Sequence, residues 1–156
     1  NPPQKFKRLF EAAIKEGFLT VAHAGEEGPP EYIWESLNLL KVKRIDHGVQ
    51  CLNDEKLVEL LLHKNIPLTV CPLSNIKLCV FDKLENHNLK KMLDKGLRVV
   101  VNSDDPAYFG GYLNTNYIET SKALQLSLED IKILIRNSFK SSFLDEKTKN
   151  NWLSKI

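Results

Sequence analysis

Four short apolar runs recur along this chain, and each of them stops at polar residues. They end near His23, His47, Cys71 and Asn102, at intervals of about 24 to 31 residues. That interval is the length of one β-strand followed by one crossover helix, so each run predicts a βα unit. Several βα units in a row are typical of an α/β fold built on a parallel sheet.

The apolar spacing places the individual elements along the chain. The strands are expected at residues 18–22, 44–48, 68–71 and 97–102. Helical periodicity predicts helices at residues 5–15, 31–40, 54–63, 88–95, 117–124, 127–142 and 145–156. Ser127 and Asp130 form a weak capping box at the start of one of them. No sequence repeat or flexible linker divides the chain, so we expect one domain.

The fourth predicted strand ends at two adjacent carboxylates. Val99 to Val101 form a β-branched run that is typical of a buried strand, and Asp104 and Asp105 follow it. Two carboxylates at a strand tip repel each other and lose hydration, and a cation would remove that cost. The simpler interpretation is that one of them caps a helix. Taken alone, this stretch leaves both interpretations open.

Polar side chains follow the other predicted strands as well. They are His23 and Glu26 after the first strand, His47 after the second, Ser74 and Asn75 after the third. Parallel strands present their carboxyl ends on one face, which is where active sites lie in such folds. A single histidine there is usually structural, but two histidines, a glutamate and two aspartates together indicate a catalytic site. This donor set suits a zinc hydrolase, although no His-Glu-x-x-His or Cys-x-x-Cys motif is present.

Composition excludes several other classes of protein. The chain has 156 residues, 42% hydrophobic and 27% charged, with a net charge of +2. It has no basic stripe for nucleic acid and no apolar run long enough for a membrane span, so we expect neither partner. We expect no signal peptide, and three cysteines without paired spacing favour a reducing, cytoplasmic setting. Because the chain lacks an initiator Met, we expect it to be a piece of something longer.

Several other residues carry weaker expectations. His63 and His87 lie on a helix or loop and are expected to be solvated. The cysteines are expected to be small buried apolar residues. Tyr108, Phe109 and Tyr112 could wall a flat ligand or pack as a loop, and the sequence leaves the two open.

Four linked motifs resemble those of the adenosine/adenine deaminase family. They are His23-Ala-Gly-Glu26, Asp46-His-Gly48, Cys71-Pro-Leu-Ser-Asn75 and Ser103-Asp-Asp-Pro106, in the family's order and spacing. Residues 71–78 and 102–112 are most similar to the adenine deaminase branch. The resemblance implies a (β/α)8 TIM barrel with one catalytic zinc ion, and a reaction in which adenine and water give hypoxanthine and ammonia in purine salvage.

The resemblance also implies a role for each site residue. His23 and Asp104 match zinc ligands, and Glu26 matches the acid that protonates the ring nitrogen beside the attacked carbon. His47 matches the residue that orients and deprotonates the attacking water. Asp105 matches the carboxylate that binds the far ring nitrogen of the base.

One departure from the family pattern is large. The family's first strand carries a His-x-His pair of zinc ligands, which this sequence lacks, and only about four of eight βα units are present. We therefore expect residues 1–156 to be the C-terminal half of a single deaminase barrel. Its partner would be the remaining half of the same full-length chain. Alone, it is expected to bind zinc poorly and leave adenine unchanged.

Three alternatives remain open at this point. The enzyme could act on adenosine or on an N6-substituted adenine, because much of the wall beyond the base would lie in the other half. The chain could instead be a non-catalytic fragment. A homo-oligomer is also left open by the sequence.

Overall fold

A single four-stranded parallel sheet forms the centre of the computed structural model, which describes residues 1–156. The strands are β1 (Val21–Ala24), β2 (Arg44–His47), β3 (Leu68–Val70) and β4 (Val99–Val101). They neighbour one another in chain order, and all three pairings are parallel. The predicted α/β architecture, four parallel strands joined by helices as in half of a TIM barrel, is confirmed.

Helices connect the strands and extend beyond the last of them. They are α1 (Lys7–Lys15), α2 (Pro30–Asn38), α3 (Glu55–His63), α4 (Pro72–Lys77), α5 (Leu89–Asp94), α6 (Pro106–Phe109), α7 (Leu113–Ala123), α8 (Leu128–Ser141) and α9 (Glu146–Leu153). Three short 3-10 turns are η1 (Pro3–Phe6), η2 (Val49–Asn53) and η3 (Leu84–Asn86). The capping box of Ser127 and Asp130 is present at the start of α8.

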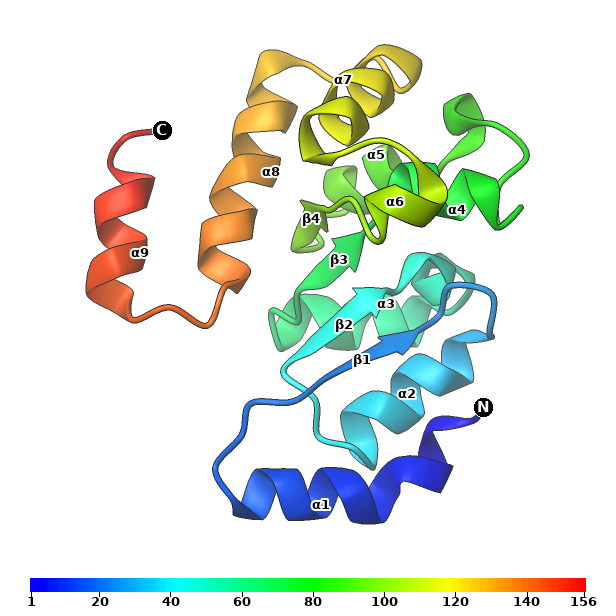
Figure 1. Ribbon diagram of the computed structural model, residues 1–156, viewed down its shortest axis with the longest axis vertical. Coiled ribbons are helices and arrows are strands. Elements are labelled where there is room, and N and C mark those ends of the chain that lie inside the picture. The colour runs from blue at the N-terminus through cyan, green and yellow to red at the C-terminus, as the bar shows by residue number, and fades with distance from the viewer.

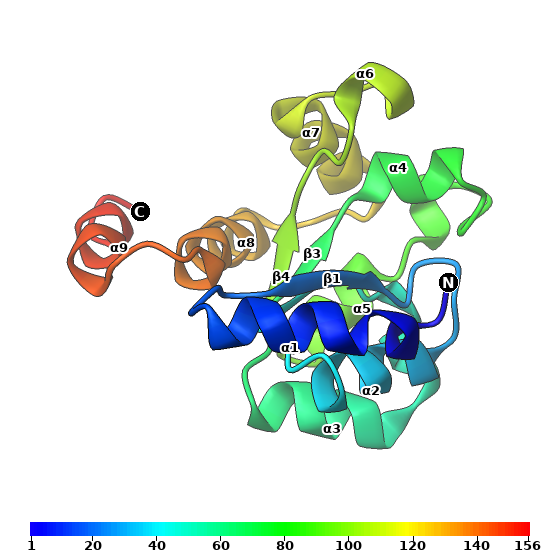
Figure 2. The same ribbon diagram turned by 60° about the horizontal axis from the view of Figure 1, so that its bottom comes forward.

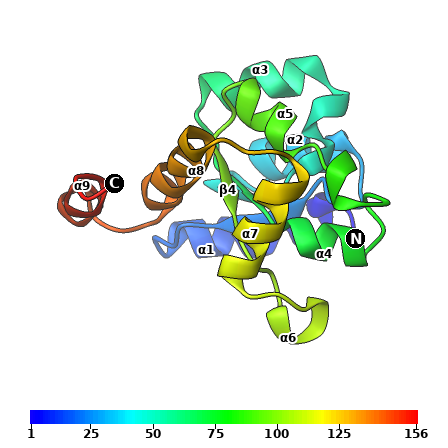
Figure 3. The ribbon, with the colours of Figure 1, turned by 90° about the horizontal axis from the view of Figure 1, so that it is seen from above.

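The helices form layers around the sheet (Figure 1). Figure 2 shows α2 and α3 below the sheet and α4, α6 and α7 above it, beyond the ends of β3 and β4. Seen from above in Figure 3, α9 lies at the outside, next to α8 and away from the remaining helices. The Phe139 and Trp152 rings, 5.7 Å apart and stacked, join α9 to α8.

The hydrophobic core lies between the sheet and the helices α2, α3, α5 and α8. Its fully buried members include Ile33, Leu57 and Met92 from those helices and Ile45 and Leu68 from the strands. Side chains alternate along a strand, so Ile45 faces this core while its neighbour Asp46 faces the opposite side of the sheet. The register pairs Asp46 with His23 on β1, which places both residues on that opposite face.

Several sequence predictions need correction. The first strand begins at Val21 instead of residue 18, because Phe18 precedes the pairing with β2 and is 67% exposed. Helix α4, which begins at Pro72, was not predicted, and α7 begins at Leu113, four residues earlier than expected. Cys79 is exposed, although the cysteines were expected to be buried.

None of the helices combines the length and the apolar composition that crossing a membrane requires.

Candidate active site

A cavity of about 390 Å³ opens at the carboxyl ends of the strands. Residues from all four strand ends line it: His23, Asp46, His47, Thr69, Cys71, Asn102, Ser103, Asp104 and Leu113. Three of the five predicted site residues, His23, His47 and Asp104, therefore share one cavity. This is the end of the strands at which parallel α/β proteins carry their active sites.

His23 presents its imidazole to the open side of this cavity. The side chain is 70% exposed, and its Nδ1 lies 3.7 Å from the Asp46 carboxylate on the neighbouring strand. Thr69 donates a hydrogen bond of 2.5 Å to Asp46, and Arg44 contacts the same oxygen at 3.3 Å. A carboxylate beside one ring nitrogen orients a histidine and leaves the other nitrogen free for a ligand. Sequence reasoning did not assign this role to Asp46.

His47 reaches the cavity through an unusual backbone conformation. By strand alternation it would face the helices with Ile45, but its φ is +68°, in the left-handed region. Its buried ring lies 5.0 Å from the ring of His23. Gly48 follows with φ +71°, and a Cβ there would come within 2.8 Å of Leu68. The His47-Gly48 turn thus directs the imidazole towards the other site residues.

Glu26 contacts the Nδ1 side of the His47 ring, and the two residues form a pair of an acid and a base. Its Oε1 lies 3.1 Å from His47 Nδ1 and accepts a hydrogen bond of 2.7 Å from Asn75. Burial, followed by the charge of Asp104, raises the pKa of Glu26 to about 7. Burial, followed by the nearby His23, lowers the pKa of His47 to about 4. Near neutral pH the carboxyl can hold a proton while the imidazole is neutral, the states needed for a general acid and a general base.

Asp104 lies on the other side of His47. Its Oδ2 is 3.7 Å from His47 Nε2 and accepts a hydrogen bond of 2.7 Å from the buried Ser74. Its φ is +56°, a second left-handed residue in the same small site. Strained backbone of this kind persists where surrounding contacts hold it, and it gathers at functional sites.

The cavity also offers donor atoms for a metal ion. His47, Cys71 and Asp104 each present a ligand atom within 4.8 Å of the others. Burial raises the pKa of the Cys71 thiol to about 12, and a neutral thiol is a poor ligand. The two predicted ligands, the imidazole of His23 and the carboxylate of Asp104, are of the types that zinc takes, but two ligands do not complete a tetrahedral site, and their role stays a prediction.

Asp105 is the predicted site residue that lies outside this cluster. Its carboxylate accepts hydrogen bonds from the backbone of Ala107 and Tyr108, so it caps α6. The helix-cap interpretation of the twin aspartates therefore holds for Asp105. Its role in substrate binding stays a prediction.

Residues that the sequence did not single out complete the surroundings. His87 was expected to be solvated, but it is 3% exposed and contacts Asn75. It follows no strand along the chain, so strand topology gave no signal for it. The side chains of Tyr108 and Tyr112 are exposed, so they do not pack as a loop, and among the aromatic rings Phe109 contacts only that of Tyr108, at 4.9 Å; none of the three lines the cavity.

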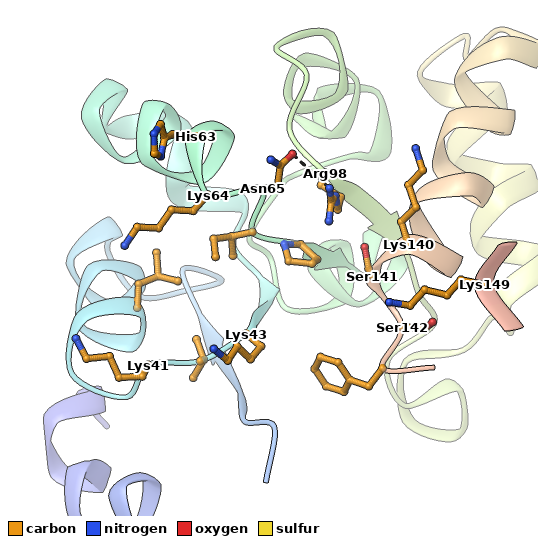
Figure 4. Close-up of a pocket in the computed structure, with 15 residues that line it drawn as sticks. Lys41, Lys43, His63, Lys64, Asn65, Arg98, Lys140, Ser141, Ser142 and Lys149 are labelled. Atoms are coloured by element: carbon orange, nitrogen blue, oxygen red, sulfur yellow. Dashed lines mark hydrogen bonds between the residues drawn. The ribbon is translucent and has the colours of Figure 1, made fainter. Parts of the chain in front are cut away.

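A second, larger cavity of about 670 Å³ lies at the opposite ends of the strands (Figure 4). Its lining includes six lysine and arginine side chains and no carboxylate: Lys41, Lys43, Lys64, Arg98, Lys140 and Lys149. It offers neither an acid nor a carboxylate ligand, so the chemistry predicted from the sequence belongs to the smaller cavity.

Comparison with known proteins gives a consistent result. The family model described as adenosine deaminase matches residues 1–156. The adenine deaminase of Hahella chejuensis is 60% identical over 156 residues, which are the whole of this chain and 47% of that protein. The adenine deaminase of Crocosphaera subtropica is 63% identical over 149 residues, 96% of this chain and 46% of its own length. The chain thus spans about half the length of the curated relatives it matches.

Solved structures agree with the sequence relatives. The crystal structure of adenine deaminase from Arthrobacter aurescens superposes with a TM-score of 0.97 at 49% identity, covering 99% of this chain and 47% of that one. An amidohydrolase from Burkholderia ambifaria, solved with bound zinc, superposes with a TM-score of 0.87 at 28% identity. It covers 98% of this chain and 43% of its own.

Proposed function

Because this chain belongs to the adenosine deaminase family, we propose that it forms the C-terminal half of a zinc-dependent adenine deaminase. The reaction is hydrolytic: adenine and water give hypoxanthine and ammonia. The observation that carries the proposal is the contact between Glu26 and His47, 3.1 Å apart, whose pKa values are shifted in opposite directions. One fold thereby holds an acid and a base side by side at neutral pH.

The acid and the base have separate tasks. The Glu26 carboxyl protonates the ring nitrogen beside carbon 6, which makes that carbon electrophilic. His47 takes one proton from water as the new carbon–oxygen bond forms. When the carbon–nitrogen bond breaks, His47 returns this proton to the departing ammonia, and the hydroxyl proton passes to Glu26. Atoms and protons balance, and both residues regain their starting states.

We assign the ring proton of His47 to Nδ1, the nitrogen that faces Glu26. Nε2 then remains free as the base on the side of Asp104, 3.7 Å away. This assignment requires His47 to be neutral, which agrees with a pKa of about 4.

Two residues of this chain would hold the zinc ion. His23 and Asp104 provide an imidazole and a carboxylate, and Asp46 and Ser74 orient them. When bound, zinc lowers the pKa of a coordinated water towards about 7. The remaining protein ligands would come from the other half of the barrel. Asp105 would bind the far ring nitrogen of the base.

Adenine is the preferred substrate because the relatives named above, at 60% and 63% identity, are called adenine deaminases. Adenosine and N6-substituted adenines are the alternatives to test. We place the enzyme in purine salvage in the cytoplasm, in keeping with three free cysteines.

An apolar groove marks a surface where the missing half would pack. It lies between α7 and α8, has a volume of about 680 Å³, and its lining includes Leu113, Tyr117, Ile118, Ile131 and Phe139. The sheet also ends in two unpaired strands, β1 and β4. Exposed apolar surface and open parallel edges are unfavourable in water, so both features favour a second half of the barrel.

The test needs a whole barrel. The N-terminal half of the Hahella chejuensis adenine deaminase, joined to this chain at the matching position, makes what we call the completed enzyme. Ammonia release is measured with adenine, adenosine and N6-methyladenine. We expect adenine to be the best substrate and Glu26→Gln to lower kcat by about 10²- to 10⁴-fold. Preference for adenosine, or full activity of the Glu26→Gln variant, would contradict the proposal.

A further inference from the structure

His87 is buried next to the candidate site although it follows no strand. It lies between η3 and α5, is 3% exposed, and its ring packs on Phe81 with centroids 4.4 Å apart. Burial lowers its pKa to about 4. The imidazole is therefore neutral over the pH range in which the Glu26 acid would work, and one of its nitrogens carries a hydrogen.

The start of α5 determines which nitrogen carries that hydrogen. The first N–H groups of a helix have no partner within the helix. The N–H of Leu89, the first residue of α5, donates to His87 Nδ1 at 3.0 Å. Because Nδ1 accepts, the hydrogen resides on Nε2, which lies 3.1 Å from Asn75 Oδ1.

This tautomer in turn determines the orientation of the Asn75 amide. Asn75 is fully buried on α4, and its oxygen accepts from His87. Its nitrogen consequently faces Glu26 and donates to Oε1 at 2.7 Å. If the amide were flipped, the Asn75 nitrogen would face the Nε2–H of His87, which is also a donor. The Asn75 oxygen would face Glu26 Oε1, which is also an acceptor.

We propose that His87 and Asn75 are positioning residues that hold the Glu26 carboxyl ready for proton transfer. Hydrogen bonds run in one direction, from Leu89 through His87 and Asn75 to Glu26 Oε1. Since Oε1 accepts from Asn75, the transferable proton resides on Oε2. This inference rests on the proposed function insofar as Glu26 is the acid of that reaction.

Removing the chain of hydrogen bonds has two consequences. The Asn75 amide becomes free to rotate, so the carboxyl loses its fixed orientation. The hydrogen bond from Asn75 also lowers the pKa of Glu26, so its loss raises that pKa further. A misplaced and weaker acid slows the chemical step more than it weakens substrate binding.

The experiment compares three variants of the completed enzyme. His87→Leu fills similar space without a donor, and His87→Gln retains an amide that can donate to Asn75. His63→Leu makes the same chemical change at an exposed histidine on α3. For His87→Leu we expect kcat on adenine to fall about tenfold or more, with KM changed less than about twofold. The alkaline limb of the pH–rate profile should move to higher pH. His87→Gln should recover most of kcat, and His63→Leu should match the parent.

Three further measurements keep the outcome decisive. If His87→Leu does not fold, Asn75→Leu takes its place, because it has a similar volume and removes the amide donor without adding a charge; the same fall in kcat is expected. If the parent acts on another purine, the same split of kcat from KM is read on that purine. If it acts on none, nuclear magnetic resonance reads the His87 tautomer and the Glu26 pKa directly.

The results that overturn the inference are equally specific. An unchanged kcat and pH profile in His87→Leu would do so. Equal losses in His87→Leu and His87→Gln, accompanied by a lower Tm, would show a purely structural role. If the His87 hydrogen were on Nδ1, the proposed series of hydrogen bonds from Leu89 to Glu26 could not form.

Discussion

At the scale of single residues, the candidate site depends on groups held in costly states. His47 and Asp104 both have left-handed backbone, and Glu26 is a partly buried acid that no lysine or arginine side chain pairs with. Each state is maintained by neighbours: Gly48 follows His47, Ser74 bonds Asp104, and Asn75 bonds Glu26. Such sites exchange stability for function, so a substitution that abolishes the chemistry can make the protein more stable.

Glu26→Gln is expected to stabilise the metal-free completed enzyme near neutral pH. The folded-state pKa of Glu26, about 7, lies above its ordinary 4.5, so the folded state binds the proton more tightly. The contribution of Glu26 to stability is therefore lost as pH rises from about 4.5 to 7. Glutamine does not titrate. We expect a gain of ~1–2 kcal/mol above pH 7, reduced from the full shift because the carboxyl is partly solvated.

Urea or thermal unfolding of the parent and Glu26→Gln proteins at pH 5 and pH 8 measures this difference. The gain should be small at pH 5 and larger at pH 8. A variant that is equally or less stable at pH 8 would show that burial does not raise the pKa of Glu26.

At the scale of elements, apolar spacing predicted the strands well and the short polar helices poorly. The run from Val99 to Val101 is a buried strand, as expected, because β-branched residues favour strands. Helix α4 was missed because Pro72, Ser74 and Asn75 together read as a loop, whereas proline is tolerated in a first helical turn.

The same contrast applies to the site. Strand topology identified His23, His47 and Asp104, since parallel strands deliver their carboxyl ends to one face. It could not identify His87, whose position follows from loop packing that has no sequence period. The spacing of residues could not predict whether Asp105 caps a helix or binds a ligand, because either role uses the same carboxylate.

Gly48, at the end of β2, and Gly17 both have a left-handed φ, but only Gly48 is crowded by neighbours. Comparing alanine substitutions at the two positions therefore distinguishes the cost of backbone strain from the cost of crowding. Gly48 has φ +71°, and a Cβ would meet Leu68 at 2.8 Å, whereas Gly17 has φ +87° and open space around it. Gly17→Ala is expected to cost about 1 kcal/mol and leave activity unchanged. Gly48→Ala is expected to cost at least ~2 kcal/mol and lower kcat, because the crowded turn displaces His47.

Tm and ammonia release on both variants of the completed enzyme provide the comparison. Equal losses of stability in the two variants, or full activity in Gly48→Ala, would mean that the turn does not set the position of His47.

At the scale of the whole molecule, this chain has a contiguous core, whereas the proposed metal site would need further ligands from a second half of the barrel. The core between the sheet and the helices α2, α3, α5 and α8 is contiguous and contains twenty buried residues. The opposite face of the sheet carries His23 and Asp46, and the unpaired edges of β1 and β4 flank it. Under the proposed function, catalysis would therefore depend on a second half of the barrel more strongly than the core does.

The isolated chain is expected to bind zinc poorly and to release no ammonia from adenine. Only His23 and Asp104 are available as the predicted ligands, and tetrahedral zinc needs four. Metal analysis after dialysis and an ammonia assay, run beside the completed enzyme, measure both properties. Stoichiometric zinc with full turnover by the isolated chain would refute the half-site interpretation.

The order of the strands in space follows their order along the chain, β1-β2-β3-β4. No strand is inserted between two others, so nothing in this half needs to thread through its counterpart during folding. Two separately synthesised polypeptides could meet along their outer strands and zip into a closed ring. A deaminase of this design could accordingly be split into a complementing pair, with adenine turnover reporting their encounter.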